Sequence, residues 1–492
     1  MNTQTSAGGP PIAPMVVRGR IITDSLIEVG GRGGDLTFLT PDVHALGHLL
    51  PLGNPSRLSD LYDISFDGIL DYLEELGELL DPEKNEHLAE ARRYSYDTAP
   101  TTPSIVDGSY AALPSAFNRK LVREIAETQV GIPYLEGWVE EERANGARLQ
   151  VRCFGARTCH IVAGNAPMIS ALSIVRNAIL RSDAIIRAPS NDPFTAIAIA
   201  RTMCDFAPDH PITRHLSVAY WRGGDTAFEE KLYQPQHIEK IIAWGGFASV
   251  KHVTQYIQPG LELISLDPKR SISIVGPEAF ASEQTMRDAA TRIAADVGGM
   301  NQVACVNARV VYVVSGTDDE GLARIERLGE MVHEAMLQLP SVISTKPKQY
   351  DRELKSHVEA LRLDDDWYHV IGGQDDEGAI IVSKSSEPVE FATKLVDRTA
   401  NLVPVDTIDE VSAAVNAYTQ TVGVYPESLK KDLLNSLSLF GAQRFVSLGY
   451  AVSGTMASPQ DGIETLRRMG KWIANEISDP ATVRPPWTAV AA

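Results

Sequence analysis

The sequence predicts an α/β protein in which a doubly wound parallel sheet is followed by a second α/β domain. Beyond Leu149, short apolar segments alternate with stretches of helical length, a pattern typical of parallel strands joined by crossover helices. A chain of 492 residues is too long for one simple core, which favours two or three domains. Its apolar content of 44% and charged content of 22% are ordinary for a globular protein.

Charge and cysteine usage restrict the classes of function. The formal net charge of -19 disfavours nucleic-acid binding, because phosphates are repelled where no basic patch compensates. We expect no membrane span and no signal peptide, since the chain lacks a long apolar run and its start has neither a basic nor an apolar stretch. Four cysteines without a C-x-x-C pair favour a reducing compartment, the cytoplasm, and no structural zinc.

Four β/α units are predicted in succession after a mainly helical region over residues 53–145. The strands are expected over residues 159–163, 184–187, 216–221 and 238–244, and the helices over 169–180, 193–206, 226–233 and 248–257. Asp192 and Pro193 form a good start for the second of these helices, because Asp can cap and proline is tolerated at the first position. Four such units form an open doubly wound sheet, which binds ligands beyond the carboxyl ends of its strands.

The second α/β block is expected to begin near residues 271–275. A helix over 282–297 leads to a turn, a strand opens at Arg309, and Thr317 has the capping-box spacing that starts another long helix. The acidic runs 364–366 and 375–377 could be a metal site, but a solvated loop is the simpler interpretation. We therefore predict no metal.

Cys305 is the candidate nucleophile. It follows the helix-ending pair Gly298–Gly299 and precedes the β-branched segment 310–314, where an accessible turn is expected. A thiol is a fair nucleophile near neutral pH, and a positive local potential increases its thiolate fraction. The other cysteines, Cys153, Cys159 and Cys204, lie within predicted strands or a helix, where a buried structural role is usual.

Asn165 is the candidate partner of this thiol. It lies between a predicted strand end and a helix start, where a side-chain amide could donate to an oxyanion. The alternative is an asparagine that caps the helix.

Together, Asn301-Gln302-Val303-Ala304-Cys305, the strand-opening Arg309 and Gly164-Asn165-Ala166-Pro167 resemble the aldehyde dehydrogenase superfamily. In ordinary aldehyde dehydrogenases the cysteine falls two residues after the glutamine; here it falls three after Gln302. This form is similar to the acyl-CoA reductase family, typified by the long-chain fatty acyl reductases of bacterial bioluminescence. The resemblance implies that Cys305 forms a thioester and that Asn165, with the Cys305 N–H, stabilises the oxyanion.

The resemblance also implies a cofactor site. Arg187-Ala188-Pro189 matches a strand that ends in Lys-x-Pro, where the lysine contacts the adenosine ribose. An arginine here could pair with a 2′-phosphate, which favours NADPH, with NADH possible. Gly245 and Gly246 match the turn that follows the pyrophosphate, at a helix N-terminus suited to anions.

Three side chains that the superfamily or family pattern would place in the site are missing from this sequence. Leu266 replaces the glutamate that activates water in aldehyde oxidisers, although Glu262 is a second candidate for that role. Residues 400–405 lack the acid that holds the nicotinamide ribose, and Gln460 replaces a family histidine, ahead of a helix expected to run through Trp472. Without a base, the acyl-enzyme would persist until a thiol or hydride attacks it.

The implied fold is aldehyde dehydrogenase-like, with four segments. These are a disordered tail (1–18), an N-terminal and dinucleotide-binding domain (19–275), a catalytic domain (276–445) and a C-terminal return (446–492). The implied function is NADPH-dependent reduction of an acyl-CoA, or another acyl thioester, to the aldehyde through a thioester on Cys305. Alternatives are NAD-dependent oxidation of aldehydes to an acid or acyl-CoA, and a non-catalytic subunit that binds a nucleotide or a partner. A homo-oligomer is expected from the superfamily, and an acyl-activating partner enzyme from the family.

Overall fold

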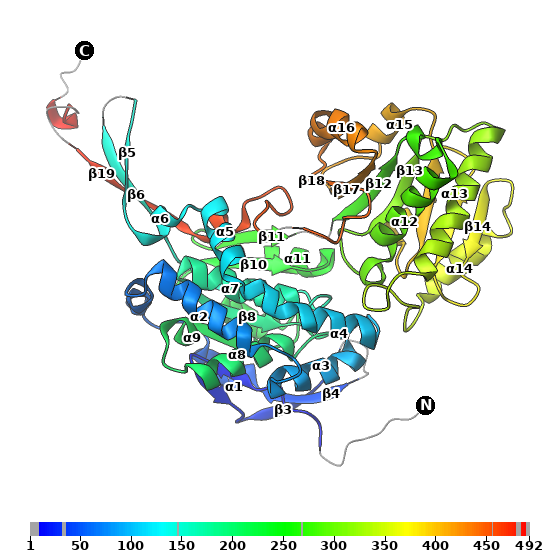
Figure 1. Ribbon diagram of the computed structural model, residues 1–492. Coiled ribbons are helices and arrows are strands. Elements are labelled where there is room, and N and C mark those ends of the chain that lie inside the picture. Colours follow the sequence, from blue (N-terminus) through cyan, green and yellow to red (C-terminus); the bar gives the residue numbers. More distant parts are fainter. Residues whose placement is uncertain are drawn as a thin grey trace.

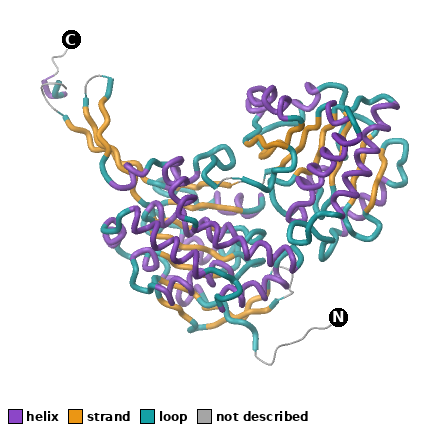
Figure 2. The backbone as a smooth tube through the Cα atoms, in the orientation of Figure 1, coloured by secondary structure: helices purple, strands orange, loops and turns teal. Residues whose placement is uncertain are grey.

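The computed structural model describes residues 9–31, 36–144, 147–266, 269–454, 456–478 and 484–488. Two α/β units lie side by side, and a three-stranded arm projects from the first (Figure 1). In both units helices cover both faces of a central sheet (Figure 2). The predicted fold class, an α/β chain with a doubly wound sheet and a second α/β domain, is confirmed.

The first unit contains a seven-stranded sheet in the order β11-β10-β7-β8-β9-β1-β2. Its strands are β11 (Glu262–Leu266), β10 (Lys240–Trp244), β7 (Arg157–Ile161), β8 (Asp183–Ala188), β9 (Leu216–Tyr220), β1 (Met15–Val17) and β2 (Arg20–Ile22). The five strands from β11 to β9 are parallel, and β1 and β2 add antiparallel to the β9 edge. The hairpin of β3 (Leu26–Gly30) and β4 (Thr37–Pro41) completes the unit.

Helices surround this sheet as the alternating pattern predicts. The predicted crossovers are α7 (Met168–Leu180), α8 (Thr195–Phe206), α10 (Thr226–Leu232) and α11 (Phe247–Thr254). The region 53–145 is mainly helical, with α2 (Phe66–Leu79), α3 (Glu86–Thr98), α4 (Pro103–Ala112), α5 (Arg119–Gln129) and α6 (Ile132–Glu136). The short helices α1 (Val43–Leu46), α9 (Pro211–Arg214) and α17 (Thr465–Met469) also belong here. The predicted start of α8 at Asp192 and Pro193 is wrong by two residues, because the helix begins at Thr195 with Phe194 as its N-cap residue. Asp192 still lies at this helix start, where the Thr195 N–H and hydroxyl donate to its Oδ1 at 3.1 and 2.6 Å.

The second unit contains another seven-stranded sheet, in the order β14-β15-β16-β13-β12-β17-β18. Its strands are β14 (Tyr368–Gly372), β15 (Ala379–Ser383), β16 (Ala400–Pro404), β13 (Ala308–Val313), β12 (Arg270–Val275), β17 (Thr419–Tyr425) and β18 (Arg444–Ser447). Its helices are α12 (Glu283–Gly298), α13 (Asp319–Leu337), α14 (Arg352–Leu361), α15 (Ile408–Ser412) and α16 (Glu427–Phe440). The residue that caps α13 is Asp318, one after the predicted Thr317, and it accepts from the Gly321 N–H at 2.8 Å.

The structure corrects two boundaries of the predicted segments. Residues 1–8 lie outside the described residues, but Met15–Val17 is not part of a disordered tail: it forms the buried strand β1 and pairs with β9. The β12 strand belongs to the second sheet, so the boundary between the units precedes Arg270 and does not follow Val275. In both places pairing with a distant strand decides the assignment.

The C-terminal segment returns to the first unit, where Leu466 and Met469 enter its hydrophobic core. The helix expected to run through Trp472 is wrong. The α17 helix ends at Met469, and Trp472 lies on β19 (Lys471–Ile477), which pairs antiparallel with β6 (Arg148–Phe154), itself paired with β5 (Val139–Glu142). Gly470 permits the change, since a Cβ there would lie 2.4 Å from the Cys153 sulfur.

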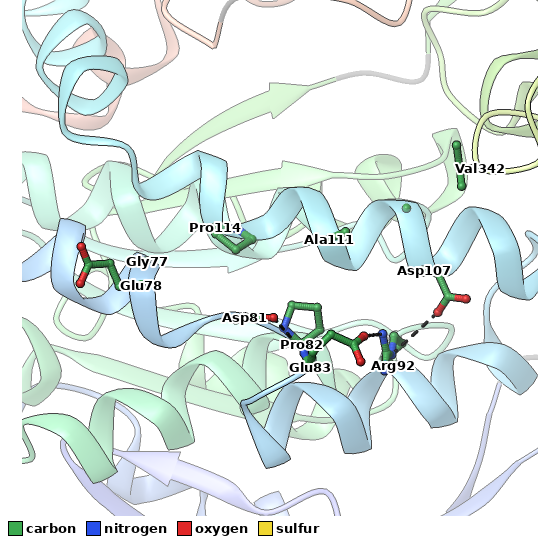
Figure 3. Close-up of a pocket in the computed structure, with 11 residues that line it drawn as sticks. Gly77, Glu78, Asp81, Pro82, Glu83, Arg92, Asp107, Ala111, Pro114 and Val342 are labelled. Carbon is green, nitrogen blue, oxygen red and sulfur yellow. Dashed lines mark hydrogen bonds and ion pairs between the residues drawn. The ribbon is translucent and has the colours of Figure 1, made fainter.

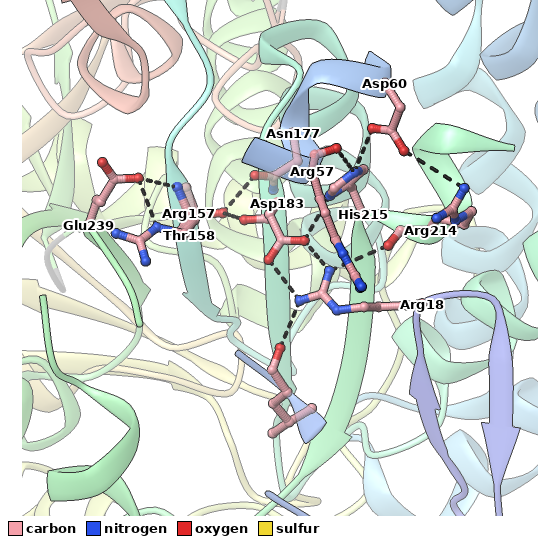
Figure 4. Close-up of polar contacts among 11 residues, drawn as sticks. Arg18, Arg57, Asp60, Arg157, Thr158, Asn177, Asp183, Arg214, His215 and Glu239 are labelled. Carbon is pink, nitrogen blue, oxygen red and sulfur yellow. Dashed lines mark hydrogen bonds and ion pairs between the residues drawn. The ribbon is translucent and has the colours of Figure 1, made fainter. Parts of the chain in front are cut away.

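A buried polar cluster fastens the amino ends of the strands in the first sheet (Figure 4). Both oxygens of Asp183 accept from the Arg18 guanidinium, and Oδ1 also bonds to Nδ1 of His215 at 3.0 Å. The other ring nitrogen of His215 lies 2.8 Å from Asp60 Oδ1. This cluster joins the turn after β1 to the starts of β8 and β9, at the end of the sheet opposite to the predicted ligand residues.

The acidic runs behave as surface loops. Asp364–Asp366 is exposed, Asp376 pairs with Lys355 at 2.5 Å, and Glu377 accepts from the N–H groups of Gly373 and Asp375. Across the described ranges, no helix is long and apolar enough to cross a bilayer.

Candidate active site

The first sheet reverses its strand order at β7, and predicted ligand residues flank that point. The chain runs through β7, β8 and β9 toward one edge, whereas β10 and β11 lie on the other side of β7. Asn165 follows β7, and Gly245 and Gly246 follow β10. Doubly wound sheets bind ligands beyond the carboxyl ends of their strands at such a reversal.

Cys305 lies in a loop of unusual backbone conformation. Met300, Asn301 and Gln302 have φ angles of 51°, 51° and 64°, and they lie in η5 (Gly299–Gln302) just before the cysteine. A non-glycine residue in this left-handed region costs about 1–3 kcal/mol, and such strain clusters at functional sites. Three in succession make this loop a candidate for a functional role.

Gln302 holds the strained loop against the second sheet. It is fully buried, its Nε2 donates to the carbonyls of Ala308 and Thr399 at 2.9 Å each, and its Oε1 accepts from the Thr399 N–H at 3.0 Å. These bonds join the loop to the starts of β13 and β16, so the glutamine of the sequence motif has a structural role.

Asn307 organises the other side of the loop. Its Nδ2 donates to the carbonyls of Asp296 and Gly299 at 3.0 and 2.9 Å, and its Oδ1 accepts from the Ala304 N–H at 3.0 Å. Sequence reasoning missed Asn307, because a loop asparagine two residues after the cysteine carries no signal until the carbonyls it binds are known.

The Asn165 side chain meets the cysteine loop across the boundary between the units. Its Nδ2 donates to the carbonyl of Val303, two residues before Cys305, at 3.2 Å. The helix-capping alternative is not observed, because α7 begins at Met168 and Pro167 precedes it without a side-chain capping bond. Within the described residues, Oδ1 of Asn165 is buried without a hydrogen-bond partner. The fold therefore places Asn165 against the loop that carries Cys305.

Cys305 differs from the other three cysteines in its exposure. Cys153, Cys159 and Cys204 are buried, as expected, and burial raises the pKa of their thiols to about 11, 12 and 11. Such thiols carry little thiolate at neutral pH. Cys305 alone of the four is partly exposed.

Neighbouring groups act on the Cys305 thiol in opposite directions. Burial and then the negative charge of Asp461 raise its pKa, whereas a hydrogen bond from Gln420 and the charge of Arg309 lower it. The net pKa is above the usual value, so the resting cysteine is mainly a thiol at neutral pH.

Two of these groups, Arg309 and Gln420, lie at bulges of the second sheet. The register of β12 shifts between Ser271 and Ile272 against β13 and between Arg270 and Ile272 against β17, so Arg309 and Gln420 lie at the irregular positions of these two strands. Ser271 Oγ donates to the Cys305 carbonyl at 2.8 Å and accepts from the Thr421 N–H at 3.2 Å. Bulges that redirect side chains are common beside active sites.

The predicted cofactor residues lie at the carboxyl ends of β8 and β10. Arg187 donates through Nε to the Trp221 carbonyl at 3.2 Å and lies against the Trp221 ring. A Cβ at Gly223 would come within 2.8 Å of Arg187 Nη2, so the guanidinium runs along the loop after β9.

The remaining cofactor residues leave room for a ligand. Pro189 packs on Gly164, where a Cβ would lie 2.9 Å from Pro189 Cγ. Gly246 is the N-cap of α11, and a Cβ there would meet nothing within 4 Å. A glycine turn that leads into an open helix N-terminus fits a phosphate group of a dinucleotide.

Glu262 does not face this site. It is at the amino end of β11, four residues before Leu266 at the carboxyl end, and β11 runs parallel to β10. It pairs with Lys240 at 2.9 Å and Arg468 at 2.8 Å. Burial opposes ionisation, but these two cations outweigh it and lower the pKa of Glu262. Leu266, in the glutamate's place, is part of the hydrophobic core.

One surface hollow lies away from the predicted site residues. A hollow of about 650 Å³ is bounded by α2, α3, α4 and Val342 of the second unit (Figure 3). Arg92 in its wall pairs with Glu83 and lies 3.8 Å from Asp107. None of the predicted site residues lines it.

Solved structures show what the fold is. The chain superposes with a TM-score of 0.72 on an NADP-dependent glyceraldehyde-3-phosphate dehydrogenase from Bacillus halodurans, at 11% identity, over 96% of this chain and 99% of that one. It superposes with a TM-score of 0.71 on lactaldehyde dehydrogenase from Escherichia coli, at 12% identity, over 95% and 100% of the two chains. The predicted aldehyde dehydrogenase-like fold is confirmed.

Comparison of the sequence with known proteins identifies one family. The chain is 25% identical over 476 residues to the long-chain acyl-protein thioester reductase of Vibrio harveyi, which covers 94% of this chain and 93% of that one. It is 28% identical over 358 residues to the enzyme of the same name from Photorhabdus laumondii, covering 72% and 70%. Residues 61–472 match the acyl-CoA reductase (LuxC) family, which confirms the resemblance seen in the cysteine and asparagine motifs. The chain therefore belongs to the acyl-CoA reductase (LuxC) family and is an aldehyde-forming oxidoreductase.

Proposed function

We propose that the protein reduces an acyl-CoA to the aldehyde with NADPH, through a covalent thioester on Cys305. The observation that carries this proposal is the hydrogen bond from Asn165 to the loop that holds Cys305. It supports the proposal because acyl transfer requires a nucleophile and an amide donor close to each other.

In the first step the Cys305 sulfur attacks the carbonyl carbon of the thioester. As the new C–S bond forms and the bond to the CoA sulfur breaks, the thiol proton leaves and the CoA thiolate takes up a proton. The second N–H of the Asn165 amide and the Cys305 N–H would stabilise the oxyanion. Loss of one such donor typically lowers the rate by about 10²–10³.

The acyl group on Cys305 must then survive until it is reduced. NADPH, when bound, would supply a hydride to this thioester. With one proton from solvent the product would be a thiohemiacetal, which would collapse to the aldehyde and the free Cys305 thiol. Leu266 occupies the position of the superfamily's water-activating glutamate and has no carboxylate. Glu262 has one, but it lies at the other end of β11, paired with Lys240 and Arg468. Neither residue can activate water against the thioester, which favours reduction over hydrolysis.

The preference for NADPH rests on Arg187. A guanidinium can hold a 2′-phosphate through two charge-assisted hydrogen bonds, whereas NADH has no such phosphate. We expect Arg187→Gln to weaken NADPH binding about tenfold or more and to leave NADH binding within about twofold. Fluorescence titration of both nucleotides measures this, and an equal loss for both would count against the assignment.

The acyl donor is tested by NADPH oxidation with a panel of acyl-CoAs, comparing the parent protein with Cys305→Ser and with Cys204→Ser as a matched control. We expect aldehyde formation to be lost only in Cys305→Ser. NAD-dependent oxidation of aldehydes without CoA would favour the alternative direction. Activity only with a protein-bound acyl group would assign the donor named for the relatives and would imply an acyl-activating partner.

We also propose a homo-oligomer that uses the arm of β5, β6 and β19. This arm projects from the first unit (Figure 1) and carries exposed apolar side chains at Trp138, Ile473 and Ile477. Exposed apolar side chains on a projecting sheet are typical of subunit contacts. Light scattering of the parent and of Ile473→Lys tests this, and a monomeric parent would exclude it.

A further inference from the structure

A second polar network converges on Cys305 from the C-terminal return. Gln420, on the bulged start of β17, is almost fully buried. Its Nε2 donates to Oδ1 of Asp461. The next residue, Thr421, is joined to the Cys305 carbonyl through Ser271 Oγ, by bonds of 3.2 and 2.8 Å, and hydrogen bonding by the Gln420 side chain lowers the pKa of the Cys305 thiol. An amide nitrogen carries two hydrogens, so one can serve Asp461 while the other serves the sulfur.

The turn that presents Asp461 is built tightly. The N–H groups of Gln460 and Ile463 donate to each other's carbonyls at 2.8 and 3.0 Å, which closes a two-residue turn. Asp461 and Gly462 have φ angles of 52° and 77° inside it. Asp tolerates the left-handed region better than most residues, yet it is held there at a cost. The turn thus fixes the direction of the Asp461 carboxylate.

A buried cation lies beside this carboxylate. Arg176 of α7 is only 2% exposed and donates through Nη2 to Gln460 Oε1 at 3.1 Å. Burial lowers the pKa of Arg176 to about 10, and the charge of Asp461 acts against that shift. In the part of the chain that the structure describes, Nε and Nη1 of Arg176 have no hydrogen-bond partner. A buried guanidinium is costly without a nearby anion, so Arg176 offsets the charge that Asp461 brings to the site.

We propose that Gln420 is a positioning residue for the reaction at Cys305: its amide, held by Asp461, orients the Cys305 sulfur toward the acyl carbonyl. The inference rests on the proposed acyl transfer to Cys305. Asp461 assists the reaction only through the amide, because the direct effect of its charge is to disfavour the Cys305 thiolate. The charged groups that face Cys305 are Asp461, Arg309 of β13 and Arg444 of β18.

Two measurements on the full-length protein test this. The first is the pH profile of Cys305 alkylation by iodoacetamide, with Cys305→Ser as the blank; it needs no acyl substrate. The second is single-turnover transfer of an acyl group from acyl-CoA to Cys305 without NADPH, followed by mass spectrometry. If the parent is alkylated but not acylated, the proposed function has failed, and the alkylation profile still decides whether Gln420 contacts the thiolate.

For Gln420→Leu we expect alkylation at pH 8 to be about tenfold slower, as for a pKa raised by one unit, and acylation to be slower by at least as much. Gln443→Leu is the matched control. It removes an amide that packs near Gly462 of the same turn and should stay within twofold of the parent. If Gln420→Leu does not fold, as judged by circular dichroism, Gln420→Glu replaces it, since a second carboxylate should slow both measurements.

Asp461→Asn separates orientation from charge. Removing the negative charge should lower the pKa of Cys305 and speed alkylation, whereas release of the Gln420 amide should slow acylation severalfold. Faster acylation in Asp461→Asn would overturn the proposal, because Asp461 would then act only through its charge. Unchanged alkylation and acylation in Gln420→Leu would overturn it as well.

Discussion

Two polar regions of the molecule, the Asp183 cluster and the surroundings of Cys305, differ in how many of their buried polar atoms have hydrogen-bond partners. At the amino ends of the first sheet, each oxygen of Asp183 and each ring nitrogen of His215 has a partner (Figure 4). Near Cys305, Oδ1 of Asn165 and Oε1 of Gln420 are buried without partners among the described residues. A saturated cluster stabilises the fold, whereas unsatisfied groups keep bonding capacity for a ligand.

The largest effect is expected at the saturated cluster. Asp183→Ala leaves Arg18 and His215 without their shared anion, and breaking such a buried pair costs about 3–5 kcal/mol. Urea unfolding measures this loss. The alkylation rate of Cys305 should stay within twofold of the parent; a large change would show that the two regions are not independent.

At Asn165 we expect the opposite: a large loss of acylation rate and a small loss of stability. Asn165→Ala should lower single-turnover acylation about 10²–10³-fold, the usual loss for one oxyanion donor. Its free energy of unfolding should fall only by about 1 kcal/mol, since one partly buried hydrogen bond is lost. Asn165→Asp is the matched control, because it keeps the volume but removes the donor; normal acylation in Asn165→Asp would exclude an oxyanion role.

The smallest effect is a pH dependence of stability that comes from Asp296. Its backbone carbonyl accepts from Asn307 of the cysteine loop, and its carboxylate faces the loop after β18. It is buried and accepts from the N–H groups of Gly449 and Ala451 at 3.0 and 2.8 Å. Burial raises its pKa to about 6, above the value of about 3.9 for an unfolded chain.

The native state therefore binds this proton more tightly than the unfolded state does. The stability from neutral Asp296 is fully present below about pH 4 and is lost as pH rises through about 6, by about 3 kcal/mol at most. Urea unfolding of the parent and Asp296→Asn at pH 4.5 and 7.5 measures it. The difference between the two proteins should change within this window, and a constant difference would exclude Asp296 as its source.

Much of the first unit could be predicted from local pattern. The strands β7 to β10 and their crossover helices follow from alternating apolar and amphipathic segments, whose periods are local properties. The errors fell where long-range pairing overrides local preference. The β1 strand exists because Met15–Val17 pairs with β9, and Trp472 lies in a strand because Lys471–Ile477 pairs with β6.

The candidate site divides in the same way. The residue types and spacing around Cys305 and Asn165 indicated thioester chemistry and the family, whereas Glu262 remained an open alternative until its place at the far end of β11 was known. Asn307, Gln420 and Asp461 carried no signal of their own. Asn307 binds carbonyls 11 and 8 residues before it, in a turn whose shape was not predictable. The importance of Gln420 and Asp461 depends on groups from distant parts of the chain, Cys305 and Arg176, which no local pattern encodes.

By itself, the sequence determined the α/β class, the cysteine and asparagine motifs, and membership in a reductase family, because each is written in neighbouring residues. Only the tertiary structure decided which polar groups surround the sulfur. That outcome depends on two sheets from different units meeting across Asn165 and Val303, on bulges in β13 and β17, and on a C-terminal turn that returns to the site. Hydrogen bonds act over about 3 Å, and interactions between charges are screened over about 10 Å. Both therefore depend on distance in space and not on distance along the chain.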